Sequence, residues 1–271
     1  MILRCGKYSM PLDKPLVMGV VNVTPDSFSD GGRYFDARAA VAHARRLADD
    51  GADLIDIGGE STRPGAAAVS EEEEMRRLIP VLEGISLEIP VSVDTRRPRV
   101  MKAALAAGAS MINDVEALTS LGALQAVAES RCAVCLMHKK GEPATMQRDP
   151  HYDDVLREVK AFLKESVERA KGAGIAVDRI VVDPGFGFGK TALHNLVLLK
   201  HLRELSELPI LAGLSRKSTL GKLTGRPVDE RLAGSLAMAL LALQSGARIL
   251  RVHDVRETRD VIAVWEAYQR A

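Results

Sequence analysis

The sequence predicts a single-domain α/β fold, a (β/α)8 TIM barrel, from three observations. Eight short apolar runs recur along the 271 residues, as expected for parallel strands that are buried on both faces. Helical patterns separate these runs, which is typical of repeated strand–helix units. Polar residues follow every run at the same end, where such barrels carry their active sites. A doubly wound open sheet is the alternative, but the chain lacks its G-x-G-x-x-G dinucleotide turn.

The strands are predicted, in chain order, at Leu16–Val23, Leu54–Gly58, Pro90–Asp94, Ser110–Asp114, Ala133–Met137, Arg179–Asp183, Pro209–Gly213 and Arg248–His253. Between them, Ser70 and Glu73 have the spacing of a helix capping box, and the glutamates after Ser70 suit the positive end of a helix dipole. Long helices are predicted within 152–175 and 229–247. Because no linker, repeat or low-complexity segment interrupts the pattern, we expect one domain over residues 1–271.

The composition excludes several classes of protein. The chain is 46% hydrophobic with a net charge of +1, so it has no basic stripe for nucleic acid or for a membrane surface. Its N-terminus lacks the apolar run of a secretory signal, and no apolar run approaches the length of a membrane span. We therefore expect a cytoplasmic protein.

The three cysteines are too few for a disulfide scaffold. Cys132 and Cys135 form a C-x-x-C pattern in a segment predicted as a buried strand. Side chains three residues apart on a strand point to opposite faces, with Cα atoms roughly 10 Å apart. Since a disulfide needs a Cα separation below roughly 7 Å, we interpret both as core residues and not as a redox or metal half-site.

The stretch DPGFGFGKT, from Asp183 to Thr191, has the look of a phosphate-binding loop. The G-x-x-x-x-G-K-[ST] pattern of such a loop would need a glycine at position 184. Pro184 stands there, and proline has no N–H group to offer a phosphate. The alternating glycines do not fit the dinucleotide pattern either, so this loop requires another explanation.

Polar residues follow each predicted strand: Asn22, Asp56, Asp94, Asn113 with Asp114, His138, Asp183, Ser215 with Lys217, and Arg251 with His253. Asp94, Asn113 and Asp183 suit a flat heterocycle with an amino-pyrimidinone edge, because adjacent N–H groups can pair with one carboxylate. Lys217 would donate to the acceptors of that ring.

A second group of residues suits an anion. Arg63, Arg251 and His253 are donors for phosphate or pyrophosphate. Asn22 is a neutral oxygen ligand that would complete a Mg²⁺ ion held mostly by phosphate oxygens and water.

Motifs across the chain resemble the dihydropteroate synthase family. They are GVVNVTPDSFSDGGRY, DIGGESTRPGA, SVDT, MINDV, LMH, DPGFGFGK, GLSRKS and RVHDV, and they extend from residue 19 to residue 255 in family order. The resemblance implies a homodimeric folate-pathway enzyme. Such an enzyme joins 6-hydroxymethyl-7,8-dihydropterin pyrophosphate to p-aminobenzoate, which yields 7,8-dihydropteroate and pyrophosphate.

The resemblance also assigns residues to each substrate. The pterin would be held by Asp94, Asn113, Asp183 and Lys217, with Val115, Met137 and Phe188 lining its pocket. Pyrophosphate and Mg²⁺ would be held by Asn22, Arg63, Arg251 and His253. p-Aminobenzoate would lie among Phe28, Thr62, Arg63, Pro64 and Ser215, under the first two loops. The expected catalytic residues are Asp94, Arg63, Lys217, Arg251 and His253.

The expected reaction is a dissociative, SN1-like substitution. Cationic groups neutralise the leaving pyrophosphate, and Asp94 and Asp183 favour the pterin cation that remains. Lys139 and Lys140 depart from the family pattern after LMH, where a hydrophobic residue is expected; their role, and that of His138, stays open.

Three other functions compete with this interpretation. A pterin-binding methyltransferase domain would share the barrel and the Asp–Asn–Asp group, but would not need NVTPDSFSDGG, STRPGA or the RVH anion site. A non-catalytic pterin-binding homologue would have lost anion ligands that are present here. A metal-dependent aldolase would need a buried strand lysine and a ligand spacing that the sequence does not show.

Overall fold

The computed structural model describes residues 1–23, 32–60, 69–142 and 145–271, with side chains in the first helix from residue 37 onward. All eight predicted strands are present as β3 (Leu16–Asn22), β4 (Leu54–Gly58), β5 (Val91–Asp94), β6 (Met111–Asp114), β7 (Ala133–Met137), β8 (Ile180–Asp183), β9 (Leu211–Ala212) and β10 (Ile249–Val252). They form one parallel sheet in the order β8-β7-β6-β5-β4-β3-β10-β9. A parallel bridge between Val182 and Ile210 brings the two edges together, so the predicted barrel is confirmed.

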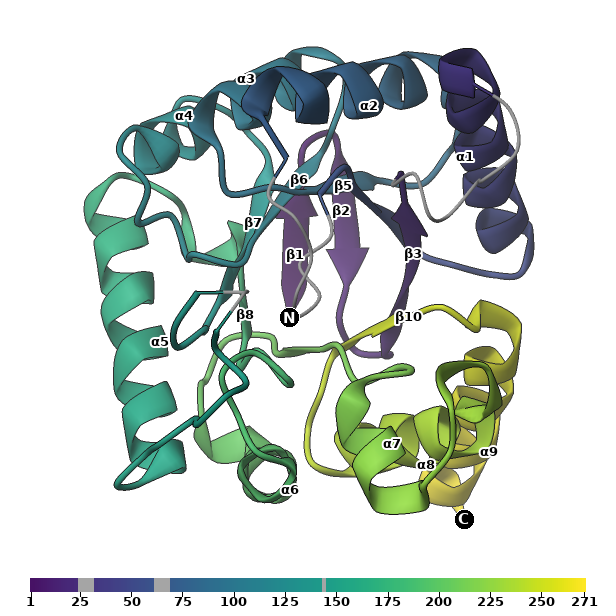
Figure 1. Ribbon diagram of the computed structural model, residues 1–271, viewed down its shortest axis with the longest axis vertical. Coiled ribbons are helices and arrows are strands. Elements are labelled where there is room, and N and C mark those ends of the chain that lie inside the picture. Colours follow the sequence, from purple (N-terminus) through teal and green to yellow (C-terminus); the bar gives the residue numbers. More distant parts are fainter. Residues whose placement is uncertain (24–31, 61–68, 143–144) are drawn as a thin grey trace.

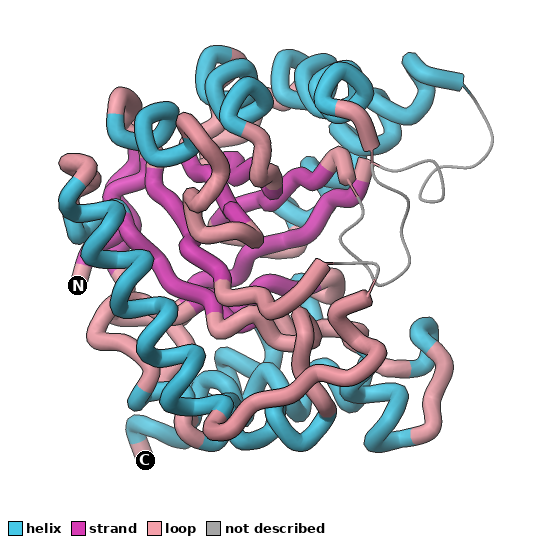
Figure 2. The backbone as a smooth tube through the Cα atoms, turned by 60° about the vertical axis from the view of Figure 1, so that its left-hand side comes forward, coloured by secondary structure: helices cyan, strands magenta, loops and turns pink. Residues whose placement is uncertain are grey.

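Helices surround the strands on the outside (Figures 1 and 2). They are α1 (Gly32–Asp49), α2 (Glu71–Gly84), α3 (Pro98–Ala106), α4 (Ala123–Ala128), α5 (Val155–Gly172), α6 (Ala192–Lys200), α7 (Ser218–Thr224), α8 (Leu232–Gln244) and α9 (Val255–Arg270). Short 3₁₀ turns occupy Val177–Arg179, Leu202–Glu204 and Val228–Glu230. None of the helices in the described ranges is long and apolar enough to cross a bilayer.

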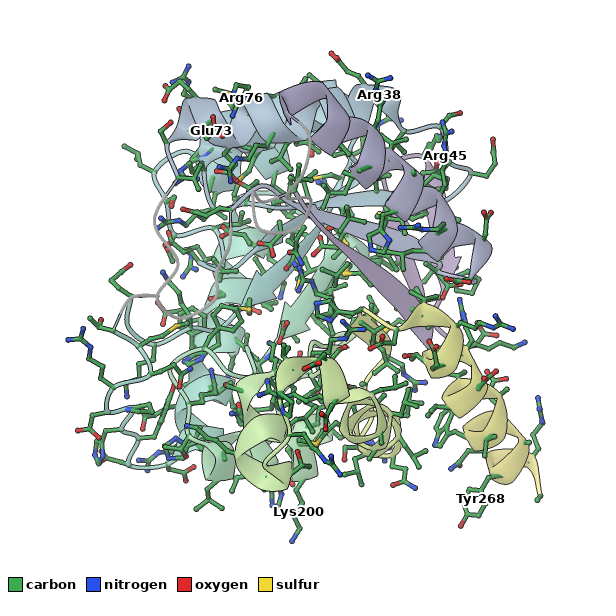
Figure 3. All side chains as sticks on the ribbon, turned by 45° about the vertical axis from the view of Figure 1, so that its right-hand side comes forward. Arg38, Arg45, Glu73, Arg76, Lys200 and Tyr268 are labelled. Carbon is green, nitrogen blue, oxygen red and sulfur yellow. The ribbon has the colours of Figure 1, made fainter. Side chains whose placement is uncertain are left out.

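Of the two hydrogen bonds of the capping box predicted at the start of α2, one is present. The Ser70 side chain accepts a hydrogen bond from the Glu73 backbone N–H at 3.2 Å. The Glu73 carboxylate binds the guanidinium group of Arg76 on the outer face of the helix (Figure 3) and also that of Arg77, which is partly buried. A full capping box occurs instead at α6, between Thr191 and His194.

An N-terminal hairpin that the sequence did not predict closes one end of the barrel. Strands β1 (Ile2–Cys5) and β2 (Tyr8–Pro11) pair antiparallel. Leu3, Cys5 and Met10 pack into one apolar cluster with barrel residues that include Met18 and Met111. Because this plug fills the end where the strands begin, the opposite end of the barrel is left for a binding site.

The apolar core is divided between the barrel interior and the layer between strands and helices. Cys135 belongs to the interior cluster, whereas Cys132 belongs to the cluster beneath the helices. All three cysteines are free and buried. The interpretation of Cys132 and Cys135 as core residues on opposite faces is therefore confirmed.

Candidate active site

Arg251 lies at the centre of a charged cluster at the carboxyl ends of the strands. Its Nε donates to Asp56 Oδ2 at 2.7 Å, and its second guanidinium nitrogen donates to Asp94 Oδ2 at 3.1 Å. Asn113 Nδ2 also donates to Asp56 Oδ2, at 3.1 Å. The second carboxylate oxygen of Asp56 is buried and has no hydrogen-bond partner among the described residues. Four strands, β4, β5, β6 and β10, thus contribute polar side chains to one network.

Burial governs the protonation of this cluster. Burial raises the pKa of Asp94 to about 7, although Arg251 opposes the shift. It also raises the pKa of Asp183, against the opposing charge of Lys217. Burial lowers the pKa of Lys217 to about 8. Burial alone would lower the pKa of Arg251, but Asp56 and Asp94 outweigh it and raise that pKa.

The ionised cluster carries an excess of negative charge. When fully ionised, the three carboxylates of Asp56, Asp94 and Asp183 face the two cations of Lys217 and Arg251, which leaves one net negative charge. In surroundings of low dielectric this charge is poorly screened. The cluster therefore favours a ligand that carries, or develops, positive charge.

The glycine loop after β8 folds back against the loop that follows β7. Gly185, Gly187 and Gly189 have φ values of +67°, +81° and +65°, which side-chain-bearing residues rarely adopt. Asp183 Oδ1 accepts from the Gly185 N–H at 2.7 Å. A Cβ on Gly185 would overlap the carbonyl oxygen of His138. Gly185 thus permits a backbone-to-backbone contact between two loops, whereas a Cβ on Gly187 would approach the Lys217 side chain at 3.3 Å.

Lys217 and Phe188 lie together beside the glycine loop. Lys217 Nζ donates to the Phe186 carbonyl and lies 4.8 Å from the centre of the Phe188 ring. Met137 is buried and would lie 3.3 Å from a Cβ on Gly185. Val115 is buried directly after β6. A partly open aromatic ring, an ammonium group and a methionine therefore border the same loop.

The remaining predicted site residues lie at other strand ends. Ser215 Oγ is 3.0 Å from His253 Nδ1 and accepts from the His253 backbone N–H at 3.3 Å. Asn22 is the last residue of β3. Gly58 lies between Asn22 and Asp94, because a Cβ placed on Gly58 would be 3.6 Å from Asp94 Cβ and 4.0 Å from Asn22 Oδ1. Four predicted residues lie outside the described residues: Phe28, Thr62, Arg63 and Pro64.

Lys139 and Lys140, left open by the sequence, both form ion pairs. Lys139 Nζ lies 2.9 Å from Glu116 Oε1. Lys140 Nζ lies 2.9 Å from Glu158 Oε2 on α5 and 4.2 Å from the centre of the Tyr152 ring. These contacts attach the β7 loop to its neighbours, so the two lysines have structural partners in place of an apolar contact.

A partly buried ionic network that the sequence did not reveal runs beside the site. Arg97 binds Glu74, which is fully buried, and also Glu60 at 3.1 Å. Arg96 binds Glu116 at 3.0 Å and approaches Glu60 at 3.6 Å. The loops after β4, β5 and β6 are therefore linked by charge pairs. The proximity of these groups depends on the barrel, and the local sequence pattern gives no signal of it.

The described residues contain no group of three His, Cys, Asp or Glu side chains placed to hold a metal ion by themselves. Mg²⁺ commonly retains waters and takes substrate phosphate oxygens, with one or two protein ligands. A single oxygen ligand such as Asn22 fits that mode of binding.

Comparison with known proteins identifies the class. The model of the family described as pterin binding enzyme matches residues 18–253, so the chain belongs to this family. Its relatives within the family include dihydropteroate synthases of several bacteria. The Escherichia coli (strain K12) dihydropteroate synthase is 51% identical over 263 residues, which cover 96% of this chain and 93% of the relative.

Solved structures agree with this assignment. A Xanthomonas albilineans dihydropteroate synthase with 4-aminobenzoic acid is 56% identical, with a TM-score of 0.92, over 99% of this chain and 98% of that chain. A structure of the same species' enzyme in complex with 7,8-dihydropteroate is 52% identical, with a TM-score of 0.91, and each chain is fully covered. The resemblance seen in the sequence motifs is confirmed.

Proposed function

We propose that the protein is a transferase that condenses 6-hydroxymethyl-7,8-dihydropterin pyrophosphate with p-aminobenzoate, releasing 7,8-dihydropteroate and pyrophosphate. The observation that carries this proposal is a cluster at the open end of a pterin-family barrel, in which Asp56, Asn113 and Asp183 are buried and Asp94 and Arg251 are partly buried. The relatives with p-aminobenzoate and with dihydropteroate support the identity of the second substrate and of the product.

The pterin is proposed to bind beside the glycine loop. Asp183 and Asp94 would pair with its amino and ring N–H groups, since a carboxylate can accept two parallel bonds. Asn113 and Lys217 would complete the ring's hydrogen bonds. The apolar faces of the ring would contact Met137, Val115 and Phe188. A flat ring with both donors and acceptors would use the carboxylate, amide, ammonium and apolar groups that border this loop.

Pyrophosphate is proposed to bind at the ends of β3 and β10. Arg63, Arg251 and His253 supply donors, and Asn22 supplies an oxygen ligand for Mg²⁺, which would neutralise the phosphate charge. Because Arg251 is paired with Asp56 and Asp94, its orientation is set before substrate binds. Preorganised cations of this kind avoid the cost of reorganisation during the reaction.

p-Aminobenzoate is proposed to lie between Ser215 and two segments, one that contains Phe28 and one that contains Thr62, Arg63 and Pro64. The support from the described residues is the position of Ser215, which faces His253 at the end of β10. This arrangement would place the amine of p-aminobenzoate near the carbon that bears pyrophosphate.

The proposed mechanism is an SN1-like substitution. The bond between the pterin methylene carbon and the pyrophosphate oxygen breaks, and its electron pair leaves with pyrophosphate. Positive charge spreads over the pterin ring, where the net negative charge of the Asp56–Asp94–Asp183 group stabilises it. The neutral amine nitrogen then forms the C–N bond and releases its proton. A strong general base is not required, because the attached ammonium group is acidic.

A synthesis assay tests the proposal. Purified protein receives the pterin pyrophosphate, p-aminobenzoate and Mg²⁺, and dihydropteroate and pyrophosphate are measured together. Product from the wild type and little product from Asp94→Ala would support the reaction and its pterin site. Pterin binding without product would indicate a non-catalytic pterin-binding homologue, and neither binding nor product would refute the proposal.

We further propose that the protein works as a homodimer in the cytoplasm, and that α7 and α8 form the dimer contact. Ala233, Ala237 and Leu241 are exposed at four-residue intervals on α8, which places them on one helical face. Leu223 on α7 and Val228 are each 50% exposed nearby. An apolar face of this kind is typical of a subunit contact.

Light scattering coupled to size-exclusion chromatography tests the dimer. Leu241→Arg is expected to give a monomer, whereas Leu121→Arg, a change of a fully exposed leucine before α4, is expected to leave a dimer. A wild-type monomer would contradict this proposal without affecting the reaction.

A further inference from the structure

A buried lysine directly follows the glycine loop, and the proposed reaction gives it no role. Lys190 is only 2% exposed. Its Nζ lies 2.9 Å from the Gly185 carbonyl oxygen, 3.0 Å from the Phe188 carbonyl oxygen and 2.9 Å from His138 Nδ1. A lysine ammonium group has three N–H donors, and these three acceptors can receive all of them; the His138 carbonyl oxygen is a longer fourth contact at 3.4 Å.

Four consecutive carbonyl groups of the glycine loop, from Gly185 to Phe188, are bound by side chains. Lys190 binds those of Gly185 and Phe188, Lys217 binds that of Phe186, and Gln147 binds that of Gly187. The loop therefore presents carbonyl oxygens to a lysine of its own sequence, where a phosphate-binding loop would present N–H groups to a phosphate. This arrangement explains the similarity between the motif and a phosphate loop, and why it does not function as one.

His138 provides a fixed acceptor on the opposite loop. It is 5% exposed, and its ring packs edge-on against Phe162 of α5 at a centroid distance of 4.9 Å. The two loops also touch through their backbones, because a Cβ on Gly189 would overlap the carbonyl oxygen of Lys140. Lys190 thus lies between two loops whose backbones are in direct contact, and any change in their separation would alter its hydrogen bonds.

We propose that Lys190 is a positioning residue that joins the glycine loop to His138 and thereby sets the positions of Phe188 and Lys217 beside the pterin ring. The inference rests on the proposed function, because it concerns the same pterin site. Lys190 acts through the Phe188 carbonyl, to which it donates, and through the loop whose Phe186 carbonyl receives Lys217. Its loss would weaken pterin binding and leave the reaction of bound substrate unchanged.

Steady-state kinetics of Lys190→Met test this inference. We expect the KM for the pterin pyrophosphate to rise about tenfold, with kcat and the KM for p-aminobenzoate within about twofold of the wild type. Lys200→Met is the control, because Lys200 projects from α6 into solvent (Figure 3). An unchanged KM for the pterin in folded Lys190→Met would overturn the inference.

The partner histidine supplies a second pair of variants if Lys190→Met does not fold. His138→Leu removes the acceptor and is expected to raise the same KM. His138→Gln keeps a side-chain acceptor and is expected to restore a KM closer to that of the wild type. Equal KM values for the two variants would overturn the proposed role of the Lys190–His138 contact.

Nitrogen NMR of histidine-labelled protein tests the contact without relying on catalysis. If Lys190 donates to Nδ1, the His138 ring carries its proton on Nε2. Burial and the nearby Lys190 lower the pKa of His138 to about 3, so the ring itself should stay neutral near neutral pH, whereas burial lowers the pKa of Lys190 to about 7 and the spectra are therefore compared at one pH below 7. A proton on Nδ1 would overturn the inference. The Nε2–H form in a protein that makes no dihydropteroate would support the contact while refuting the proposed function.

Discussion

Gly185→Ala should destabilise the protein more than a glycine-to-alanine substitution at another position with positive φ. Both Gly185 and Gly174 have positive φ, at +67° and +89°. A Cβ on Gly174 would have no atom within 4 Å, whereas one on Gly185 would overlap the His138 carbonyl oxygen well inside 3.0 Å. The difference in stability between Gly174→Ala and Gly185→Ala therefore measures the cost of the steric overlap apart from the cost of backbone strain.

The magnitude follows from these two contributions. Alanine in the left-handed region costs about 1–2 kcal/mol, and this is the whole cost expected for Gly174→Ala. Gly185→Ala adds the overlap, which requires a backbone shift and costs about 1–3 kcal/mol or more. The His138 backbone has little freedom to retreat, because the N–H of the same residue donates to the Asp183 carbonyl at 3.0 Å.

Differential scanning calorimetry measures the difference. With about 2–4 °C of Tm per kcal/mol for a chain of this size, Gly174→Ala should lower Tm by about 3 °C and Gly185→Ala by about 10 °C. Pterin binding, measured by isothermal titration calorimetry, should weaken only in Gly185→Ala. Equal losses of Tm in the two variants would refute the argument that the glycine loop is packed against the β7 loop.

Three further outcomes are expected. The pKa of Asp94 is about 7 in the folded chain and about 3.9 in the unfolded chain. Between these pH values the folded chain binds more protons, so this group lowers the free energy of unfolding as pH rises. The Tm of Asp94→Asn relative to wild type should therefore rise from about pH 4 to about pH 7, and a flat difference would contradict the raised pKa. Arg97→Met leaves the carboxylate of Glu74 buried without its guanidinium partner and should cost about 3–5 kcal/mol in urea unfolding, whereas the exposed Arg99→Met should cost below about 1 kcal/mol. The three free, buried cysteines should resist a thiol reagent such as DTNB in the native protein and react after unfolding, and rapid modification of the native chain would count against their burial.

The eight barrel strands could be predicted because each is a short, continuous apolar run. The predicted and observed limits of Leu54–Gly58 and Ala133–Met137 coincide. The N-terminal hairpin was missed, since its strands alternate between buried and exposed residues and are not continuous apolar runs. The Ser70 cap was predicted, but the second half of the capping box was not realised because Glu73 binds arginines instead.

The position of the site could also be predicted, because parallel strands in a barrel all end at the same rim. This placed Asp94, Asn113, Asp183, Lys217 and Arg251 together, and the structure shows them as neighbours. The partners of these groups could not be predicted. Asp56 was predicted at a strand end but was assigned no role. Only the fold shows that Asp56 binds Arg251, a residue 195 positions further along the chain.

The local amino-acid sequence therefore determined the strands, the barrel class and the end of the barrel where the polar site residues lie, because apolar runs and strand-end residues are properties of neighbouring positions. The tertiary structure alone decided which charges pair and which groups are buried. Lys190 shows the difference most clearly: in the sequence it ends a loop that looks suited to phosphate, and in the fold it is enclosed by the Gly185 and Phe188 carbonyls and His138. Desolvation and pairing energies depend on what surrounds a group in space, and those surroundings come from distant parts of the chain.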